Sequence, residues 1–223
     1  MAQQLGFDLP VRTALGRDDF LVAPSNAVAL TMVDAWRTWP LGKFVLSGPA
    51  GSGKTHLTHV WAKDAGAQIR SAADLDTSKI EQLFERPVAV EDVDRIAKNT
   101  PAQTALFHLH NALQTNQKPL LLTGERPPRH WGLELPDLQS RVDAAGHAGL
   151  DAPDDTLLAA VLAKLFADRQ LTPRKDVIPY LVTHMERSFA AAGDLVAQLD
   201  AASLAEKKPI TRALAARCLD NAV

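Results

Sequence analysis

The chain has 223 residues, of which 46% are hydrophobic and 22% charged, and its formal net charge is −2. This length predicts one domain or two unequal ones, with a core large enough to need neither disulfides nor metals. The near-neutral charge argues against a generally basic nucleic-acid binder. Cys218 is the only cysteine, so no internal disulfide can form, and a reducing, cytoplasmic location is expected. No run of about 18 apolar residues predicts a membrane span.

The first part of the chain predicts strands that alternate with helices. Residues 1–19 are polar apart from one short apolar stretch and are expected to lie outside the core. A helix is predicted to begin at Ser25 or Asn26 and to end before Pro40. Apolar runs and helical periodicity then predict strands at 43–47, 88–90 and 119–123, and helices at 55–65 and 101–114. This alternation predicts an α/β fold with a parallel sheet covered by helices on both faces.

The pattern changes after residue 150. Four helices are predicted, at 154–169, 173–186, 188–203 and 211–222, with no strand between them. We therefore expect three parts: an N-terminal segment and linker at 1–19, an α/β domain at 20–150 and a small all-helical domain at 151–223.

A glycine-rich loop follows the first predicted strand and opens the next helix, with the sequence Gly48-Pro49-Ala50-Gly51-Ser52-Gly53-Lys54-Thr55. Glycines let backbone N–H groups approach phosphates closely, and the N-terminus of a helix favours negative charge. In such a phosphate loop, the lysine reaches the β- and γ-phosphates and the threonine hydroxyl binds Mg²⁺. The strand–loop–helix setting makes a chance glycine-rich turn a poor alternative, and ATP or ADP with Mg²⁺ is the expected ligand.

Polar residues at the ends of the other two predicted strands complete a candidate site. Glu91 and Asp92 follow the second strand and provide carboxylates for Mg²⁺, Glu91 being the expected ligand. Thr123 ends the third strand, where a polar side chain can sense the γ-phosphate. The alternatives are an acidic loop and a threonine that only makes a turn.

Several segments together resemble the DnaA replication-initiator branch of the AAA+ ATPases. The first is Gly53-Lys54-Thr55-His56-Leu57, which adds His56 to the expected nucleotide-binding residues. The others, in chain order, are Phe20-Leu21-Val22-Ala23-Pro24-Ser25-Asn26, Phe107-His108-Leu109-His110-Asn111-Ala112-Leu113, Leu122-Thr123-Gly124-Glu125-Arg126-Pro127-Pro128 and Leu138-Gln139-Ser140-Arg141. The resemblance covers roughly residues 18–220. It implies an AAA+ nucleotide-binding domain followed by a helical lid, with Arg141 as an arginine finger that acts on a neighbouring subunit.

The chain has no room for the DNA-binding domain of DnaA, and in this it resembles the Hda family of DnaA regulators. In that family an N-terminal peptide binds the sliding clamp of DNA polymerase, and the clamp-bound protein stimulates hydrolysis of the ATP on DnaA. The resemblance thus implies the clamp and DnaA as partners, with Gln4, Leu5, Phe7 and Leu9 as the clamp-binding residues. A polar tail with scattered apolar residues is the alternative for that peptide. Homo-oligomer formation stays open, and no strong DNA-binding surface is expected.

The sequence departs from the DnaA pattern at three places. Glu91-Asp92 replaces two aspartates, Gly124-Glu125 replaces Ser-Asp, and the sensor-2 arginine of the lid falls near Gly193, with Arg187 as the nearest alternative. These changes predict weak intrinsic ATP hydrolysis. The alternative function is a DNA-remodelling AAA+ ATPase, such as a helicase loader or transposition helper, for which a basic stripe would be expected.

Overall fold

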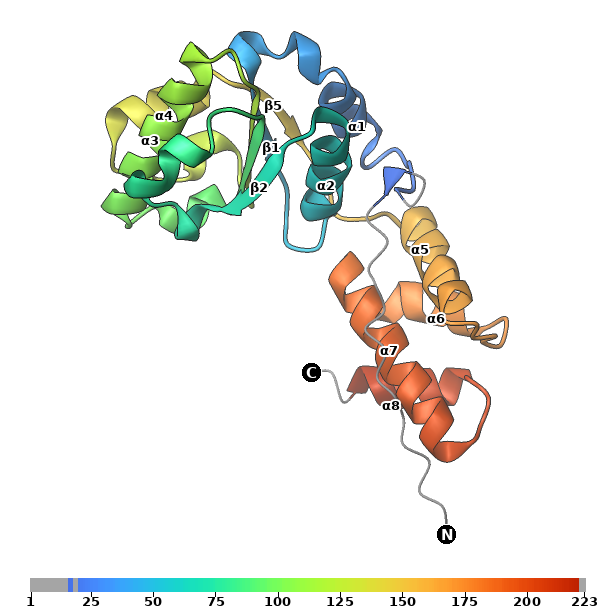
Figure 1. Ribbon diagram of the computed structural model, residues 1–223. Helices are drawn as coiled ribbons and strands as arrows, with labels where there is room; N and C mark the ends of the chain where they lie inside the picture. Colours follow the sequence, from blue (N-terminus) through green and yellow to red (C-terminus); the bar gives the residue numbers. More distant parts are fainter. Residues whose placement is uncertain (1–15, 18–19, 221–223) are drawn as a thin grey trace.

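The computed structural model describes residues 16–17 and 20–220, so the predicted clamp-binding residues lie outside the described part. Figure 1 shows two bodies, a sheet flanked by helices and a purely helical body, joined by the segment 150–154. The sheet is built from residues before this segment and the helical body from residues after it.

The sheet has five strands, and all four strand pairs are parallel. Their order across the sheet is β2-β3-β4-β1-β5. β1 therefore lies between β4 and β5, and all five of its residues are buried. The strands are β1 (Lys43–Ser47), β2 (Gln68–Ser71), β3 (Val88–Glu91), β4 (Leu120–Gly124) and β5 (Gly146–Gly149).

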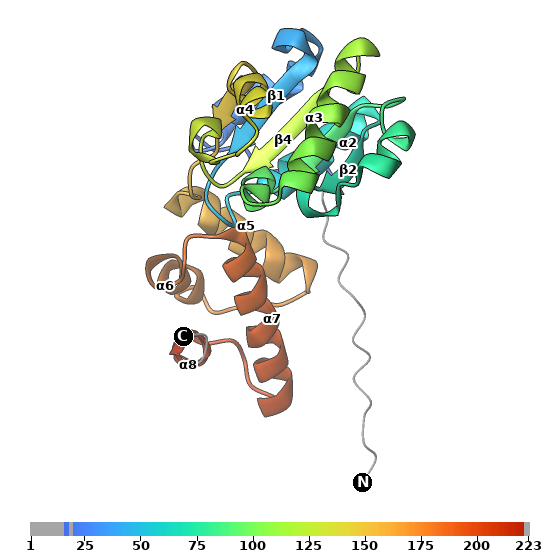
Figure 2. The same ribbon diagram turned by 90° about the vertical axis from the view of Figure 1, so that its left-hand side faces the viewer.

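Helices cover both faces of the sheet, as Figure 2 shows. Because successive strand residues point to opposite faces, Phe44 and Leu46 pack towards α1 (Ala27–Asp34) and α2 (Lys54–Ala65), whereas Val45 packs towards α3 (Thr100–Thr115) and α4 (Pro136–Asp143). The predicted parallel sheet with helices on both faces is confirmed.

Some elements of the α/β domain differ from the prediction. β2, β5 and α4 were not predicted, and α1 ends at Asp34 rather than continuing towards Pro40. Short 3₁₀ turns fill the connections at Trp36–Thr38, Pro40–Gly42, Ala72–Asp74, Thr77–Gln82, Val93–Ile96 and Pro128–His130. Leu41 has a φ of 52°, which interrupts regular helix there.

The helical body consists of α5 (Asp155–Asp168), α6 (Val177–His184), α7 (Phe189–Glu206) and α8 (Arg212–Asp220). It has a hydrophobic core of its own, which includes Leu158, Phe166, Leu181 and Leu199. Asp154 and Ser188 cap α5 and α7 by accepting backbone N–H groups of the first turn. The predicted all-helical body is confirmed.

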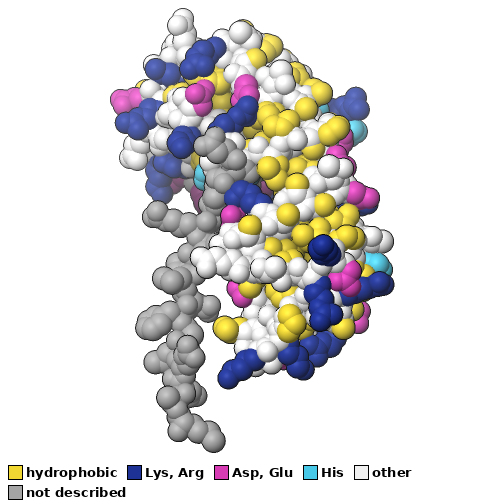
Figure 3. All heavy atoms as spheres, turned by 90° about the vertical axis from the view of Figure 1, so that its right-hand side faces the viewer, with side chains coloured by type: hydrophobic (Ala, Val, Ile, Leu, Met, Phe, Trp, Pro, Cys, Tyr) yellow, Lys and Arg dark blue, Asp and Glu magenta, His cyan; other side chains and the backbone are white. Residues whose placement is uncertain are grey.

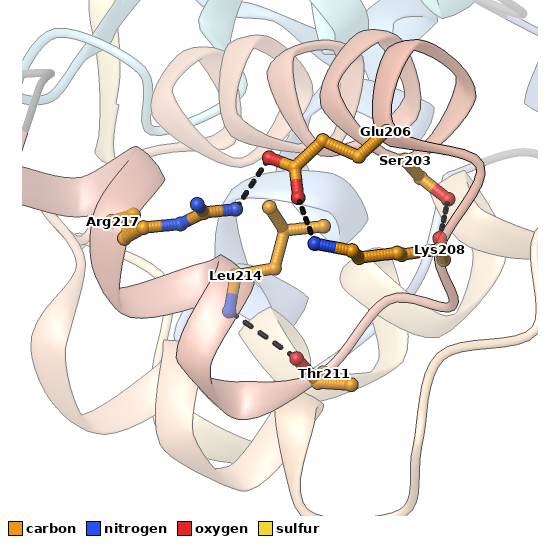
Figure 4. A network of polar contacts seen from close by, with 6 residues as sticks. All are labelled: Ser203, Glu206, Lys208, Thr211, Leu214 and Arg217. Atoms are coloured by element: carbon orange, nitrogen blue, oxygen red, sulfur yellow. Dashed lines mark hydrogen bonds and ion pairs between the residues drawn. The ribbon is translucent and has the colours of Figure 1, made fainter.

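A network of polar contacts fixes the turn between α7 and α8 (Figure 4). Glu206 accepts hydrogen bonds from Arg217 at 2.6 Å and Lys208 at 3.4 Å, and the bond from Arg217 is the main cause that lowers the pKa of this carboxyl. Ser203 Oγ donates to the Lys208 carbonyl at 2.6 Å. These groups are exposed, so they define the geometry of the turn more than they stabilise it.

The described surface carries charges of both signs. Figure 3 shows Lys and Arg side chains among Asp and Glu side chains over most of this face, with hydrophobic atoms between them, and a group of Lys and Arg side chains at the lower end of the helical body. Within residues 16–17 and 20–220, no helix is long and apolar enough to cross a membrane.

Candidate nucleotide site

The phosphate loop lies at the carboxyl end of β1, which has β4 on one side and β5 on the other. Gly51 and Gly53 have φ angles of 70° and 98°, which side chains rarely adopt. A Cβ added to Gly48 would lie 2.5 Å from the carbonyl oxygen of Leu150. The glycines are thus required by the conformation and close packing of the loop, and α2 begins directly after it at Lys54.

Lys54 is held inside this loop. Its Nζ donates to the carbonyl oxygens of Gly48 at 2.6 Å and Pro49 at 2.9 Å. Burial lowers the pKa of this ammonium, and the carboxylates of Glu125, Asp92 and Asp94 oppose that shift. The ammonium is therefore held by the carbonyl oxygens of the loop at the beginning of α2.

The beginning of α2 provides the other groups expected of a phosphate loop. Thr55 is exposed, and Ser52 is buried with no hydrogen-bond partner for its Oγ among the described residues. His56 Nε2 lies 3.2 Å from the carbonyl oxygen of Gly16, and its ring packs edge-on against Phe20 at 5.2 Å. The segment that resembles the adenine-side box thus lies against the phosphate-loop helix.

The predicted strand-end residues meet beside the loop. Because Val90 is in register with Leu122, β3 and β4 end next to each other. The backbone N–H of Asp92 donates to Thr123 Oγ1 at 3.2 Å, and Asp92 has a left-handed φ of 59°. Glu91 Oε1 is buried and has no hydrogen-bond partner in the described part of the chain.

These oxygens fit Mg²⁺. The Thr55 hydroxyl and the Glu91 carboxylate are hard oxygen ligands, and Mg²⁺ at such sites takes its remaining ligands from phosphate and water. The described residues hold no group of three or more His, Cys, Asp or Glu arranged for a metal, so the protein itself offers no complete cage.

The sequence analysis missed the carboxylate of Asp94 and gave that of Glu125 no role beside Lys54. Asp94 Oδ2 accepts the backbone N–H of Glu125 at 2.8 Å, and its Oδ1 is buried without a partner among the described residues. Both side chains act electrostatically on Lys54. The acidic run from Glu91 to Asp94 was the available signal, because it continues past the strand-end pair.

The departure at Gly124 has a steric cause. A Cβ at Gly124 would lie 2.6 Å from Nε1 of Trp131, which is buried and donates to the Arg126 carbonyl at 2.6 Å. A serine side chain therefore has no room here, and Trp131 occupies the space.

Arg141 lies in the last turn of α4 and is not part of the phosphate-loop cluster. Its guanidinium carbon is 5.0 Å from the centre of the Phe107 ring. The pKa of His110 is lowered to about 4 by burial, then by the charges of Lys43 and Arg141.

A protein-family model matches the C-terminal part of the chain. The family model for "Hda, lid domain" matches residues 154–219, which are the four helices of the C-terminal body. Residues 154–219 therefore belong to the Hda lid-domain family.

Solved structures show the same AAA+ fold. Domain III of the replication initiation protein DnaA from Thermotoga maritima is 18% identical, with a TM-score of 0.81 over 96% of this chain and 98% of that one. AMPPCP-bound DnaA from Aquifex aeolicus is 19% identical, with a TM-score of 0.69 over 82% of this chain and 64% of that one. The RuvB Holliday junction branch migration motor from Thermotoga maritima is 17% identical, with a TM-score of 0.70 over 94% of this chain and 72% of that one.

The predicted sensor-2 position in the lid is Gly193, and the nearest arginine to it in the sequence, Arg187, is bound elsewhere. Arg187 forms an ion pair with Asp155 and donates to the Pro153 carbonyl, so it binds the segment between the two bodies. Gly193 lies in the second turn of α7, and a Cβ there would meet nothing within 4 Å.

Proposed function

We propose that this protein is a negative regulator of chromosomal replication initiation. It binds an adenine nucleotide and the polymerase sliding clamp, and it promotes hydrolysis of the ATP bound to DnaA by inserting Arg141 as an arginine finger. The Hda-type lid on a DnaA-like AAA+ fold supports the class of function.

The observation that carries the proposal is that the Arg141 side chain is partly exposed and unpaired among the described residues. Its side chain is partly exposed and has no ion pair or hydrogen bond to another described residue, and its contact is the face of Phe107. An aromatic ring attracts a cation without neutralising it. The alternative, a local salt bridge, has no carboxylate partner in the described chain, so the guanidinium is available to another molecule.

The nucleotide part rests on residues 48–55, with Lys54 directed at the β- and γ-phosphates, His56 near the adenine side, and Mg²⁺ held by Thr55 and Glu91. Asp92 and Thr123 are assigned to the γ-phosphate, and the hydrogen bond between them at the adjacent ends of β3 and β4 supports a shared role. The AMPPCP-bound DnaA structures support an adenine nucleotide as the ligand. Since position 193 is a glycine and Arg187 is bound to Asp155, intrinsic hydrolysis is expected to be slow.

The clamp part rests on the N-terminal peptide. Gln4 can both donate and accept in a small polar pocket, and Leu5, Phe7 and Leu9 can fill an apolar one, as extended peptides do on protein surfaces. A clamp-bound regulator would work in the cytoplasm, and self-association stays open.

The test adds this protein and DNA-loaded clamp to ATP-bound DnaA and follows ADP formation. Acceleration that needs the protein and the clamp together supports the proposal. Rapid DNA-stimulated ATP turnover by this protein alone, above about 1 s⁻¹, would instead favour the DNA-remodelling ATPase.

A further inference from the structure

The start of α7 lies directly against the phosphate loop. The backbone N–H of Phe189 donates to the Gly51 carbonyl at 2.9 Å. A Cβ added to Gly51 would overlap the Cβ of Ser188, and one added to Gly53 would lie 3.1 Å from the Phe189 ring. Figure 1 shows this end of α7 directed at the loop between β1 and α2.

The contact contains no charged side chain. Residues 189–192 are Phe-Ala-Ala-Ala, and Arg187 is bound to Asp155 and Pro153 beside the connecting segment. Ser188 is buried, and its Oγ accepts the N–H of Ala191 at 3.0 Å, so its hydroxyl caps the helix. What the lid presents to the loop is one backbone N–H, one phenyl ring and one close-packed Cβ.

We propose that Ser188 and Phe189 form a latch that closes the lid on the phosphate loop, and that this latch must open before a nucleotide can enter or leave. The proposal rests on the nucleotide-binding part of the proposed function. The latch contacts the two glycines whose backbone would surround the phosphates, so it controls the route to the site. The rates at which the nucleotide enters and leaves therefore depend on the contacts of Phe189 with the loop.

The latch can be dissected at one position. Phe189→Ala removes the ring but keeps the N–H, whereas Phe189→Pro removes both. Proline is favoured at the first position of a helix. Ser188 already has φ −142° and ψ 148°, the extended conformation that a following proline requires, so α7 should persist in both variants.

The experiment measures association and dissociation of a fluorescent ADP analogue by stopped flow. Both rates should rise together in Phe189→Ala, and by a further threefold to tenfold in Phe189→Pro, the contribution of one backbone hydrogen bond. The dissociation constant should change less than either rate. Leu204→Ala, at an exposed position near the other end of α7, is the matched control and should leave both rates unchanged.

Three outcomes would overturn the latch. If Phe189→Ala raises the dissociation rate alone, the ring is a wall of the bound site and not a gate. If the wild type binds the nucleotide but neither variant changes the rates, the latch is wrong while the proposed function stands. If the wild type binds no nucleotide, the nucleotide-binding function fails and the latch fails with it.

Discussion

Replacing Lys54 by methionine tests the nucleotide site most sharply. The variant keeps the length and apolar stem of the side chain and removes the ammonium, which now donates to the carbonyls of Gly48 and Pro49. If phosphate oxygens take over these two hydrogen bonds on binding, their loss costs about 1.5–3 kcal/mol each, because one partner is charged. The sum of about 3–6 kcal/mol predicts that ADP and ATP bind about 10²- to 10⁴-fold more weakly.

Titration calorimetry measures this change, and the melting temperature provides the control. Without nucleotide, Lys54→Met should melt close to the wild type, because removing a buried cation relieves its desolvation while two hydrogen bonds are lost. Saturating nucleotide should raise the melting temperature of the wild type and not that of the variant. A dissociation constant within threefold of the wild-type value would refute the assignment of Lys54.

Three further predictions address the fold and the N-terminal peptide. Gly124→Ser should lower the free energy of unfolding by about 1–3 kcal/mol, because the new side chain overlaps Trp131. Denaturant unfolding measures this free energy, and a variant as stable as the wild type would contradict the steric argument. Burial holds the folded-state pKa of His110 at about 4, below its ordinary 6.5, so the wild type should lose stability as pH falls from about 6.5 to 4. His110→Leu should flatten that loss, and an equally steep decline would exclude His110 as its cause. Deleting residues 1–10 should abolish clamp binding in a pull-down with little change in melting temperature. Gln4→Ala should weaken clamp binding more than tenfold, about 1.4 kcal/mol. A truncated protein that still retains the clamp would refute the peptide assignment.

The sequence predicted the strands that carry strong local signals. β1, β3 and β4 are short apolar runs, each buried on both faces by helices, and such runs are recognisable without the rest of the fold. β2 and β5 are the two edge strands. Their residues, Gln-Ile-Arg-Ser and Gly-His-Ala-Gly, are mostly polar or small, and each strand forms because its one neighbour provides the hydrogen bonds.

The candidate site also has a part that local sequence patterns predict and a part that they do not. The phosphate loop is a contiguous motif, and the residues that end β3 and β4 could be placed because parallel strands end at one edge. The contacts of Asp94 with Glu125, and of Phe189 with Gly51, join segments far apart in the chain. No local pattern encodes such contacts, so they became visible only once the elements were packed together.

The central claim is that Arg141 acts on ATP bound to DnaA. ADP formation on DnaA, with DNA-loaded clamp present, should fall to the unstimulated rate when Arg141→Ala replaces the wild type, since arginine fingers contribute about 10³–10⁵ in rate in GTPases. Arg141→Lys should also fail, because an ammonium lacks the planar fork of the guanidinium. Arg126→Ala, at an exposed arginine of the same domain, is the control and should stimulate normally. If a folded Arg141→Ala that still binds nucleotide and clamp stimulates DnaA as well as the wild type does, the arginine-finger account is wrong.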